Sequence, residues 1–332
     1  MDNTSSKAGG LFLVGGIVKS STPGGRPQVV QDHLAALLQV QNLVVLIGSG
    51  ASFHLGSPKT RELNNEAIGG LVNDAGESLD TRDQDLLLIL NPSNGGDLEK
   101  LLNGLQLAAT LASQAALDEV TFGSGDSARA FTVSEVEQLR RKINAALAHA
   151  CKLPNKDSAL QPPYNDDPYQ AHRTFISRIV RSRRGNLPRP KVFTTNYDLV
   201  IERSLDQLGY PYIDGFSGTV DRRLNLAYYG LDFHRVESTS QKVLARADNA
   251  MYLHKIHGSL NWRASMERDA STGIESLEVL QVADDSTAEG ERVLIYPTTA
   301  KEGDTLSYPY SDLLRLLGDA VQQDDTAIIS VG

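Results

Sequence analysis

The chain has 332 residues, of which 40% are hydrophobic and 22% are charged, as in ordinary globular proteins. This length allows one large domain with an insertion, or two modest domains. No apolar run approaches the roughly twenty residues of a membrane span, so we expect no transmembrane segment. A net charge of −9 argues against broad electrostatic binding to nucleic acid. The single cysteine, Cys151, excludes an intrachain disulfide and a Cys-based zinc cluster. We therefore expect a cytoplasmic protein in which Cys151 is a buried helical thiol.

The first 41 residues are expected to form a flexible or partner-ordered arm. Their apolar segment, Leu11 to Val18, lacks the small-residue cleavage site of a secretory signal. Ser20 to Pro27, which follow it, are rich in glycine, proline and serine.

Short apolar runs predict the strands of a buried sheet. The clearest is Leu43 to Ile47, which is rich in β-branched residues and ends directly at Gly48. A second run, Lys191 to Thr194, is followed by the helix-like Leu199 to Leu208. Shorter candidates are Tyr252 to Ile256, Val293 to Tyr296 and Thr326 to Val331. This alternation predicts an α/β fold, with a Rossmann-like parallel sheet that has helices on both faces.

Residues 63–169 between the first two strands are predicted to form a large helical insertion. Asp97 to Leu117 are rich in leucine and alanine, and Thr132 to Glu135 form a capping-box pattern. Two polar stretches nearer the C-terminus, Met266 to Ser276 and Ala283 to Glu291, are interpreted as surface loops.

A group of arginines follows the end of this region. We interpret them as cations that complement a helix C-terminus, and we expect no direct binding to nucleic acid. The group consists of Arg178, Arg181, Arg183, Arg184 and Arg189.

Three motifs each follow a predicted strand. GSGAS, at Gly48 to Ser52, would let the backbone approach a phosphate, although such a turn can equally serve tight packing. TTNYD, at Thr194 to Asp198, places polar groups where α/β proteins bind ligands, but Asn and Asp there also commonly cap helices. HGSL, at His257 to Leu260, offers a histidine that can act as a general base. His254 lies three residues earlier with no ligand-like spacing to a Cys or carboxylate, which disfavours zinc.

In this order the motifs resemble those of the sirtuin superfamily, which carries GAGxSxxxGIPDFR, TQNxD and HG. The chain reads GSGASFHLGSPKTR, TTNYD and HGSL. The resemblance covers Asn42 to Arg61 and, more loosely, Arg173 to Gly332. It implies an NAD-binding domain over residues 42–62 and 170–332, with NAD+ as substrate and no metal. The first motif keeps, without gaps, Gly48, Gly50, Ser52, Gly56, Pro58 and Arg61.

The resemblance also implies roles for individual residues. Asn196 would orient the ribose or a water molecule, Asp198 would accept from the carboxamide, and His257 would take a proton. Arg61 would approach the phosphates or the ribose, and Thr195 would contact the bound dinucleotide. The pyrophosphate would be held by Gly48, Ser49, Gly50, Ala51 and Ser52.

Three departures from the family pattern refine the expected activity. Lys59 and Thr60 replace an Asp-Phe pair whose Phe shields the nicotinamide end from water. The cysteine pairs of the zinc module are absent, and Asn261 to Ser265 read NWRAS where the first would fall. The chain stops at Gly332, where the family continues into a loop for the adenosine end, so we expect the domain to continue.

These departures resemble the bacterial sirtuin-like NAD+ hydrolases of antiphage defence. That resemblance implies a homo-oligomer and a partner such as a HerA-type ATPase or a short Argonaute. The alternatives are an NAD-dependent protein deacylase and a non-catalytic sensor of NAD or ADP-ribose in a defence assembly.

Overall fold

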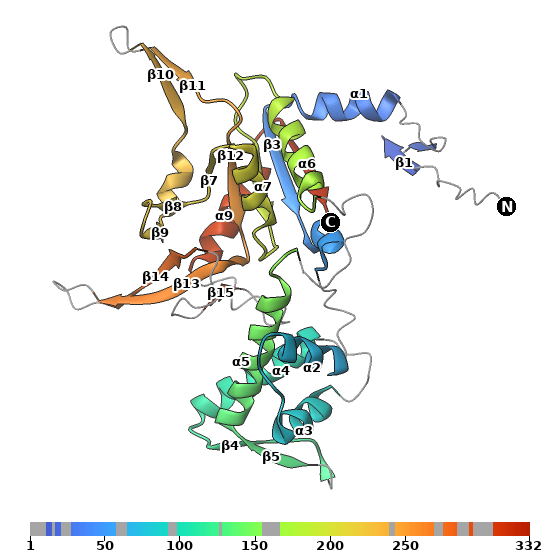
Figure 1. The fold of residues 1–332 in the computed structure, drawn as a ribbon, viewed down its shortest axis with the longest axis vertical. Helices are drawn as coiled ribbons and strands as arrows, with labels where there is room; N and C mark the ends of the chain where they lie inside the picture. Colours follow the sequence, from blue (N-terminus) through green and yellow to red (C-terminus); the bar gives the residue numbers. More distant parts are fainter. Residues whose placement is uncertain are drawn as a thin grey trace.

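A parallel five-stranded sheet forms the centre of the molecule (Figure 1). The computed structural model describes residues 11–14, 17–20, 28–57, 65–91, 98–125, 128–154, 167–238, 243–268, 275–283, 292–294 and 308–332. All neighbouring strands of the sheet are parallel, which confirms the expected α/β, Rossmann-like class. Their order is β16 (Thr326–Val331), β3 (Asn42–Ile47), β6 (Lys191–Thr194), β12 (Met251–Lys255) and β7 (Tyr212–Ile213).

Helices cover both faces of this sheet, as the sequence predicts. Leu43, Val45 and Ile47 of β3 face α6 (Gln170–Arg181) and α7 (Val200–Leu208). Val44 points the other way and packs in one cluster with α9 (Tyr310–Val321). Because successive side chains of a strand alternate between faces, a strand covered on both sides must be apolar throughout. This explains the unbroken apolar run that identifies β3.

A second, antiparallel five-stranded sheet was not predicted. It contains β15 (Arg292–Leu294), β13 (Gly258–Arg268), β14 (Glu275–Gln281), β9 (Arg222–Leu224) and β8 (Phe216–Ser217), in that order. η4 (Leu226–Gly230), a short 3₁₀ helix, follows β9. The first two residues of the predicted run Val293 to Tyr296 form the end of β15, so they belong to this antiparallel sheet and not to the parallel one, and the last two residues of the run lie outside the described part.

The first of the two polar stretches expected as loops is partly strand. β13 extends through Met266 to Arg268, and β14 begins at Glu275, so the first loop prediction was wrong at both ends. Residues 269–274 lie outside the described part, as do 284–291 of the second stretch. The exposed side of the β13–β14 hairpin carries charged residues, so its sequence resembles a polar loop. One of them, Glu267 of β13, forms an ion pair with Arg223 of β9 at 2.5 Å.

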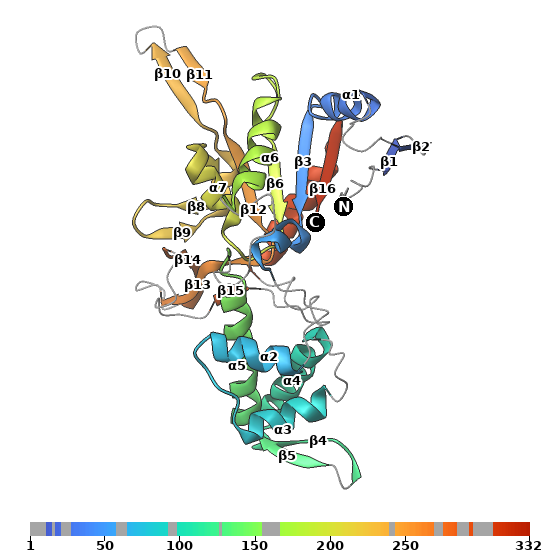
Figure 2. The same cartoon turned by 45° about the vertical axis from the view of Figure 1, so that its right-hand side comes forward.

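Residues 65–150 form a mainly helical body below the parallel sheet (Figure 2). Its elements are α2 (Asn65–Asp74), α3 (Thr81–Leu90), α4 (Leu98–Gln114), β4 (Glu119–Phe122), β5 (Arg129–Thr132) and α5 (Val133–Ala150). It has a hydrophobic core of its own, centred on residues such as Leu105, Phe131 and Leu139. The capping box is confirmed, because the Glu135 amide donates to Thr132 Oγ1 at 3.2 Å and the Thr132 amide to Glu135 Oε2 at 2.8 Å. The β4–β5 hairpin was not expected in this region.

Two further hairpins and one helix extend from the main body (Figure 1). The segment expected as an arm contains a hairpin of β1 (Leu11–Val14) and β2 (Ile17–Ser20), followed by α1 (Gln28–Leu37). β10 (His234–Ser238) and β11 (Val243–Arg246) form a ribbon at the opposite side. Among the described helices, none has the length and apolarity required to span a membrane.

Candidate functional site

The GSGAS motif forms a tight turn after β3. Gly48 leads directly into η1 (Ser49–Leu55), a 3₁₀ helix that ends at Gly56 with φ 87°. A Cβ at Gly50 would lie 2.9 Å from the carbonyl carbon of Gly332, whereas a Cβ at Gly48 would meet nothing closer than 3.8 Å. Gly50 is therefore the position where close backbone approach requires glycine. The end of β16 lies beside this turn (Figure 2), and the Gly48 amide donates to the Val331 carbonyl at 2.8 Å.

The TTNYD motif is tied to the end of β3 by hydrogen bonds. The Thr194 hydroxyl donates to the Ile47 carbonyl at 2.9 Å, and the Thr195 amide donates to the same oxygen at 3.2 Å. The Asn196 amide in turn donates to Thr194 Oγ1 at 3.0 Å. These bonds fix the first residues after β6 next to the GSGAS turn.

A directed chain of side-chain hydrogen bonds joins the two motifs. Ser52 donates through Oγ to Asp198 Oδ2 at 3.0 Å, and Asn196 Nδ2 donates to Ser52 Oγ at 3.3 Å. A carboxylate only accepts, so Ser52 must donate to it and keeps a lone pair for the Asn196 amide. This order turns Asn196 Oδ1 away from Ser52. That oxygen is buried and has no hydrogen-bond partner within the described residues.

Asp198 also caps the helix that follows it. Its Oδ1 accepts from the Val200 amide at 3.1 Å, which is the local role that Asp commonly plays after a strand. Lys255 donates to the Asp198 carbonyl and forms an ion pair with Glu202 at 3.1 Å. Burial raises the pKa of Glu202, and the Lys255 charge opposes that rise. Asp198 is thus held inside the protein as a positioning group.

The HGSL motif continues the same edge of the sheet. The Ile256 amide donates to the Thr194 carbonyl at 3.0 Å, and the Leu260 amide donates to the Tyr197 carbonyl at 3.0 Å. His257 is partly buried and lies between these two attachments. Gly258 has φ 83°, and a Cβ there would lie 2.0 Å from the Val293 carbonyl oxygen, so this position requires glycine.

His254 has a structural environment. Its ring stacks between Phe193 and Tyr229, each with a centroid distance of 4.1 Å, and its Nδ1 lies 3.2 Å from the Val192 carbonyl. Burial lowers the pKa of His254 to about 3 and keeps the ring neutral. Within the described ranges, no group of three or more His, Cys, Asp or Glu residues could hold a metal ion.

Sequence reasoning missed a pair of histidines beside the site. His54 of η1 and His172 of α6 stack with centroids 5.3 Å apart. Burial, and then the nearby His54, lower the pKa of His172 to about 4, while the charge of Asp198 acts in the opposite direction. His172 also lines a cavity of about 160 Å³ beside Ala51. His54 stands at an unmatched position of the first motif and His172 lies outside all three motifs, so their spacing carries no signal.

The helical body reaches the site through the end of α5. Cys151 follows α5 directly and, with Tyr197, packs against the cluster that contains Leu260. The residue as a whole is partly buried, but enclosure of its thiol raises the pKa of Cys151 to about 12. This thiol is therefore protonated at neutral pH.

Pro58, Lys59, Thr60 and Arg61 lie outside the described residues, so the expected contact of Arg61 with a phosphate or ribose stays a prediction. Of the predicted site residues that are described, the structure brings together Asn196, Asp198 and Thr195 with the GSGAS turn. It places His257 on the adjacent strand end.

These features define a Rossmann-like α/β protein with a polar cluster at the carboxyl ends of three adjacent parallel strands. No protein-family model and no curated protein matches the chain.

Proposed function

We propose that the chain binds NAD+ at the carboxyl ends of β3, β6 and β12 and hydrolyses its nicotinamide–ribose bond to nicotinamide and ADP-ribose. The observation that carries this proposal is the convergence of GSGAS, TTNYD and HGSL at one sheet edge. Ser52 and Asp198 are 146 positions apart in the chain, and their side chains are hydrogen-bonded. In open α/β sheets, this edge is where ligands bind.

The pyrophosphate would be held by the turn from Gly48 to Ser52. Gly50 lets the turn pack against the backbone of Gly332, and the amides at the start of η1 would supply donors for the negative charge. Arg61 and Thr195 would complete the contacts to the dinucleotide.

The ribose would meet Asn196. A buried amide oxygen without a partner costs about 1–3 kcal/mol, and a ribose hydroxyl or a water molecule would supply the missing donor. The hydrogen bonds that run from Asn196 through Ser52 to Asp198 hold the Asn196 side-chain amide in that orientation. Asp198 would therefore have a positioning role, in addition to the expected contact with the nicotinamide carboxamide.

Departure of nicotinamide builds positive charge on the ribose, as in other glycosidic cleavages. Loss of the leaving group neutralises the pyridinium, and water then forms the new bond to the anomeric carbon. His257 would accept the proton of that water, directly or through a ribose hydroxyl. No step requires a metal ion.

Water is the proposed acceptor because the chain lacks the cysteine pairs of deacylases. A role in antiphage defence, with NAD+ depletion on activation, rests on the resemblance alone, as do the homo-oligomer and a HerA-type or Argonaute partner.

The acceptor is tested by incubating the full chain with NAD+ in the absence and presence of an acetylated peptide, and by quantifying nicotinamide, ADP-ribose and acetyl-ADP-ribose. We expect ADP-ribose without any peptide and no acetylated product with it. Strict dependence on the peptide would support the deacylase instead, and NAD+ binding without cleavage would support a sensor.

A further inference from the structure

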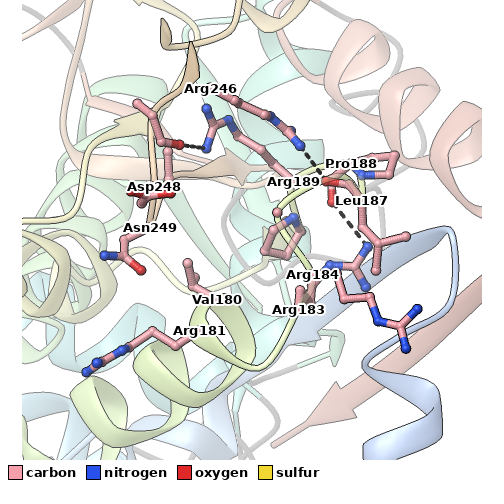
Figure 3. A pocket seen from close by; sticks show the side chains of 14 residues that line it. Val180, Arg181, Arg183, Arg184, Leu187, Pro188, Arg189, Arg246, Asp248 and Asn249 are labelled. Carbon is pink, nitrogen blue, oxygen red and sulfur yellow. Dashed lines mark hydrogen bonds between the residues drawn. The ribbon is translucent and has the colours of Figure 1, made fainter. Parts of the chain in front are cut away.

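A second cavity, of about 360 Å³, lies where the chain enters strands β6 and β12, at the opposite end of these strands from the candidate site (Figure 3). Its wall comes from the end of α6, the loop through Pro190 that enters β6, and the turn from Arg246 to Ala250 that enters β12. Pro190 precedes β6 and Asn196 follows it, and the four residues of this strand alone extend over roughly 13 Å at about 3.3 Å per residue. The two sites are therefore distinct.

Five arginines line this cavity, and three of them are fixed by the protein. Arg183 donates to the carbonyls of Leu38 at 2.9 Å, Gln41 at 3.0 Å and Pro188 at 3.1 Å. It thereby ties the end of α1 to the cavity wall rather than complementing α6. Burial and the neighbouring charge of Arg246 lower the pKa of Arg183, so two cations repel each other here.

Arg189 and Arg246 form the other fixed part of the wall. Arg189 donates to the carbonyls of Ala247 and Phe233, both at 2.9 Å. Both guanidinium groups pair with one carboxylate, Asp232, which lies 2.9 Å from Arg246 Nε. The single carboxylate of Asp232 is therefore shared by two guanidinium groups.

The guanidinium groups of Arg181 and Arg184 are not held by other side chains or carbonyls of the described residues. Both are exposed, and neither guanidinium group has a hydrogen bond or ion pair with any described residue; Arg184 takes part only through its carbonyl, which accepts from the Leu187 amide at 3.1 Å. They stand on either side of the cavity, and no dashed line reaches their guanidinium groups (Figure 3). Arg181 belongs to the last turn of α6, as the sequence interpretation of this cluster expects, but Arg184 lies beyond that helix.

The charges of the cavity do not balance. Five guanidinium groups are accompanied by two carboxylates, Asp232 and Asp248, which leaves a local surplus of three positive charges. The chain as a whole carries −9. Such a concave surplus of one sign concentrates counter-ions from solution.

We propose that this cavity binds a small molecule through its phosphate group, at a site separate from the one that cleaves NAD+. An arginine guanidinium group can donate two parallel hydrogen bonds to a pair of phosphate oxygens. The guanidinium groups of Arg181 and Arg184, which have no carboxylate partner among the described residues, flank the opening. The volume lies at the lower end of the range of small-molecule sites, about 300–1,000 Å³. A mononucleotide or a free pyrophosphate supplies the same chemistry.

The proposal is tested by calorimetric titration of the full chain with pyrophosphate and with ADP, and the binding that depends on Arg181 and Arg184 is assigned to this cavity. The test variant is the double substitution Arg181→Ala with Arg184→Ala. The matched control is Arg178→Ala, an exposed arginine of α6 that does not line the cavity.

We expect binding by the wild type, at least a tenfold loss of affinity in the double variant, and no more than a twofold change in the control. Preference for ADP would identify a nucleotide as the ligand, and equal affinity would identify the phosphate group alone. No binding by the wild type, or an equal loss in Arg178→Ala, would overturn the proposal. So would tight, arginine-dependent binding of single-stranded DNA without binding of either small probe. Nicotinamide release is measured separately, so its absence bears on the proposed hydrolase and not on this cavity.

Discussion

The hydroxyl of Ser52 provides the sharpest test of the hydrogen-bond chain in the candidate site. Ser52 is only 1% exposed, and its hydroxyl joins Asp198 at 3.0 Å to Asn196 at 3.3 Å. Ser52→Ala removes a hydrogen bond to a charged group, worth about 1.5–3 kcal/mol, and leaves the Asn196 amide without an acceptor. The longer second bond adds a smaller cost, so we expect a total loss of about 2–3 kcal/mol in the free energy of unfolding.

The assay is urea denaturation with a matched control, Ser204→Ala. Ser204 is 0% exposed, but its hydroxyl donates to the Val200 carbonyl at 2.6 Å within α7, so its loss leaves no charged group unpaired. We expect Ser204→Ala to cost about 1 kcal/mol or less. Ser52→Ala should also slow nicotinamide release by at least tenfold, because Asn196 loses its fixed orientation. Equal stability of Ser52→Ala and wild type would refute the hydrogen-bond chain.

Two further predictions concern single positions. Gly258→Ala should lower the free energy of unfolding by more than about 2 kcal/mol, because φ is 83° and the new Cβ would lie 2.0 Å from the Val293 carbonyl oxygen. The control is Gly318→Ala in α9, where a Cβ would meet nothing within 4 Å, and it should be neutral or stabilising in the same urea assay. His172 has its pKa lowered to about 4, so the unfolded chain binds the extra proton first and stability falls as pH drops from about 6.5 towards 4. His172→Gln should remove about 2 kcal/mol of the stability difference between pH 7 and pH 5, while the contribution of His254 remains. An unchanged pH profile would contradict the buried, neutral state of His172.

The central strands were predictable because their environment is uniform. Strands β3, β6 and β16 are short apolar runs that pair with neighbouring strands inside the sheet. Each run ends where the chain leaves the sheet. The motifs at those ends were therefore located to within a residue or two. For the same reason, the capping box at Thr132 was identifiable from four adjacent residues.

The antiparallel sheet was not predictable by the same route. β8 has two residues and β9 has three, which is too short for an alternating pattern. Its longer strands, β13 and β14, carry charges on the exposed side and so read as polar loops.

The contacts inside the site also exceed what the sequence specifies. The link between Ser52 and Asp198 depends on the packing of β3 beside β6, and the stacking of His54 on His172 depends on where α6 lies. Cys151 was expected as a buried helical thiol, but it lies just after α5 and joins the helical body to Tyr197. These relations follow from tertiary packing and not from local spacing.

The most direct measurement of the central claim is nicotinamide release under single-turnover conditions, with the full chain in excess over NAD+. Asn196→Ala and His257→Ala are compared with matched controls at exposed positions outside the site, Asn225→Ala and His149→Ala. We predict cleavage by the wild type and both controls, and a loss of at least about 100-fold in each site variant, with the fold retained. Undiminished release by Asn196→Ala or His257→Ala, or no release by the wild type, would contradict the assignment of this site to NAD+ cleavage.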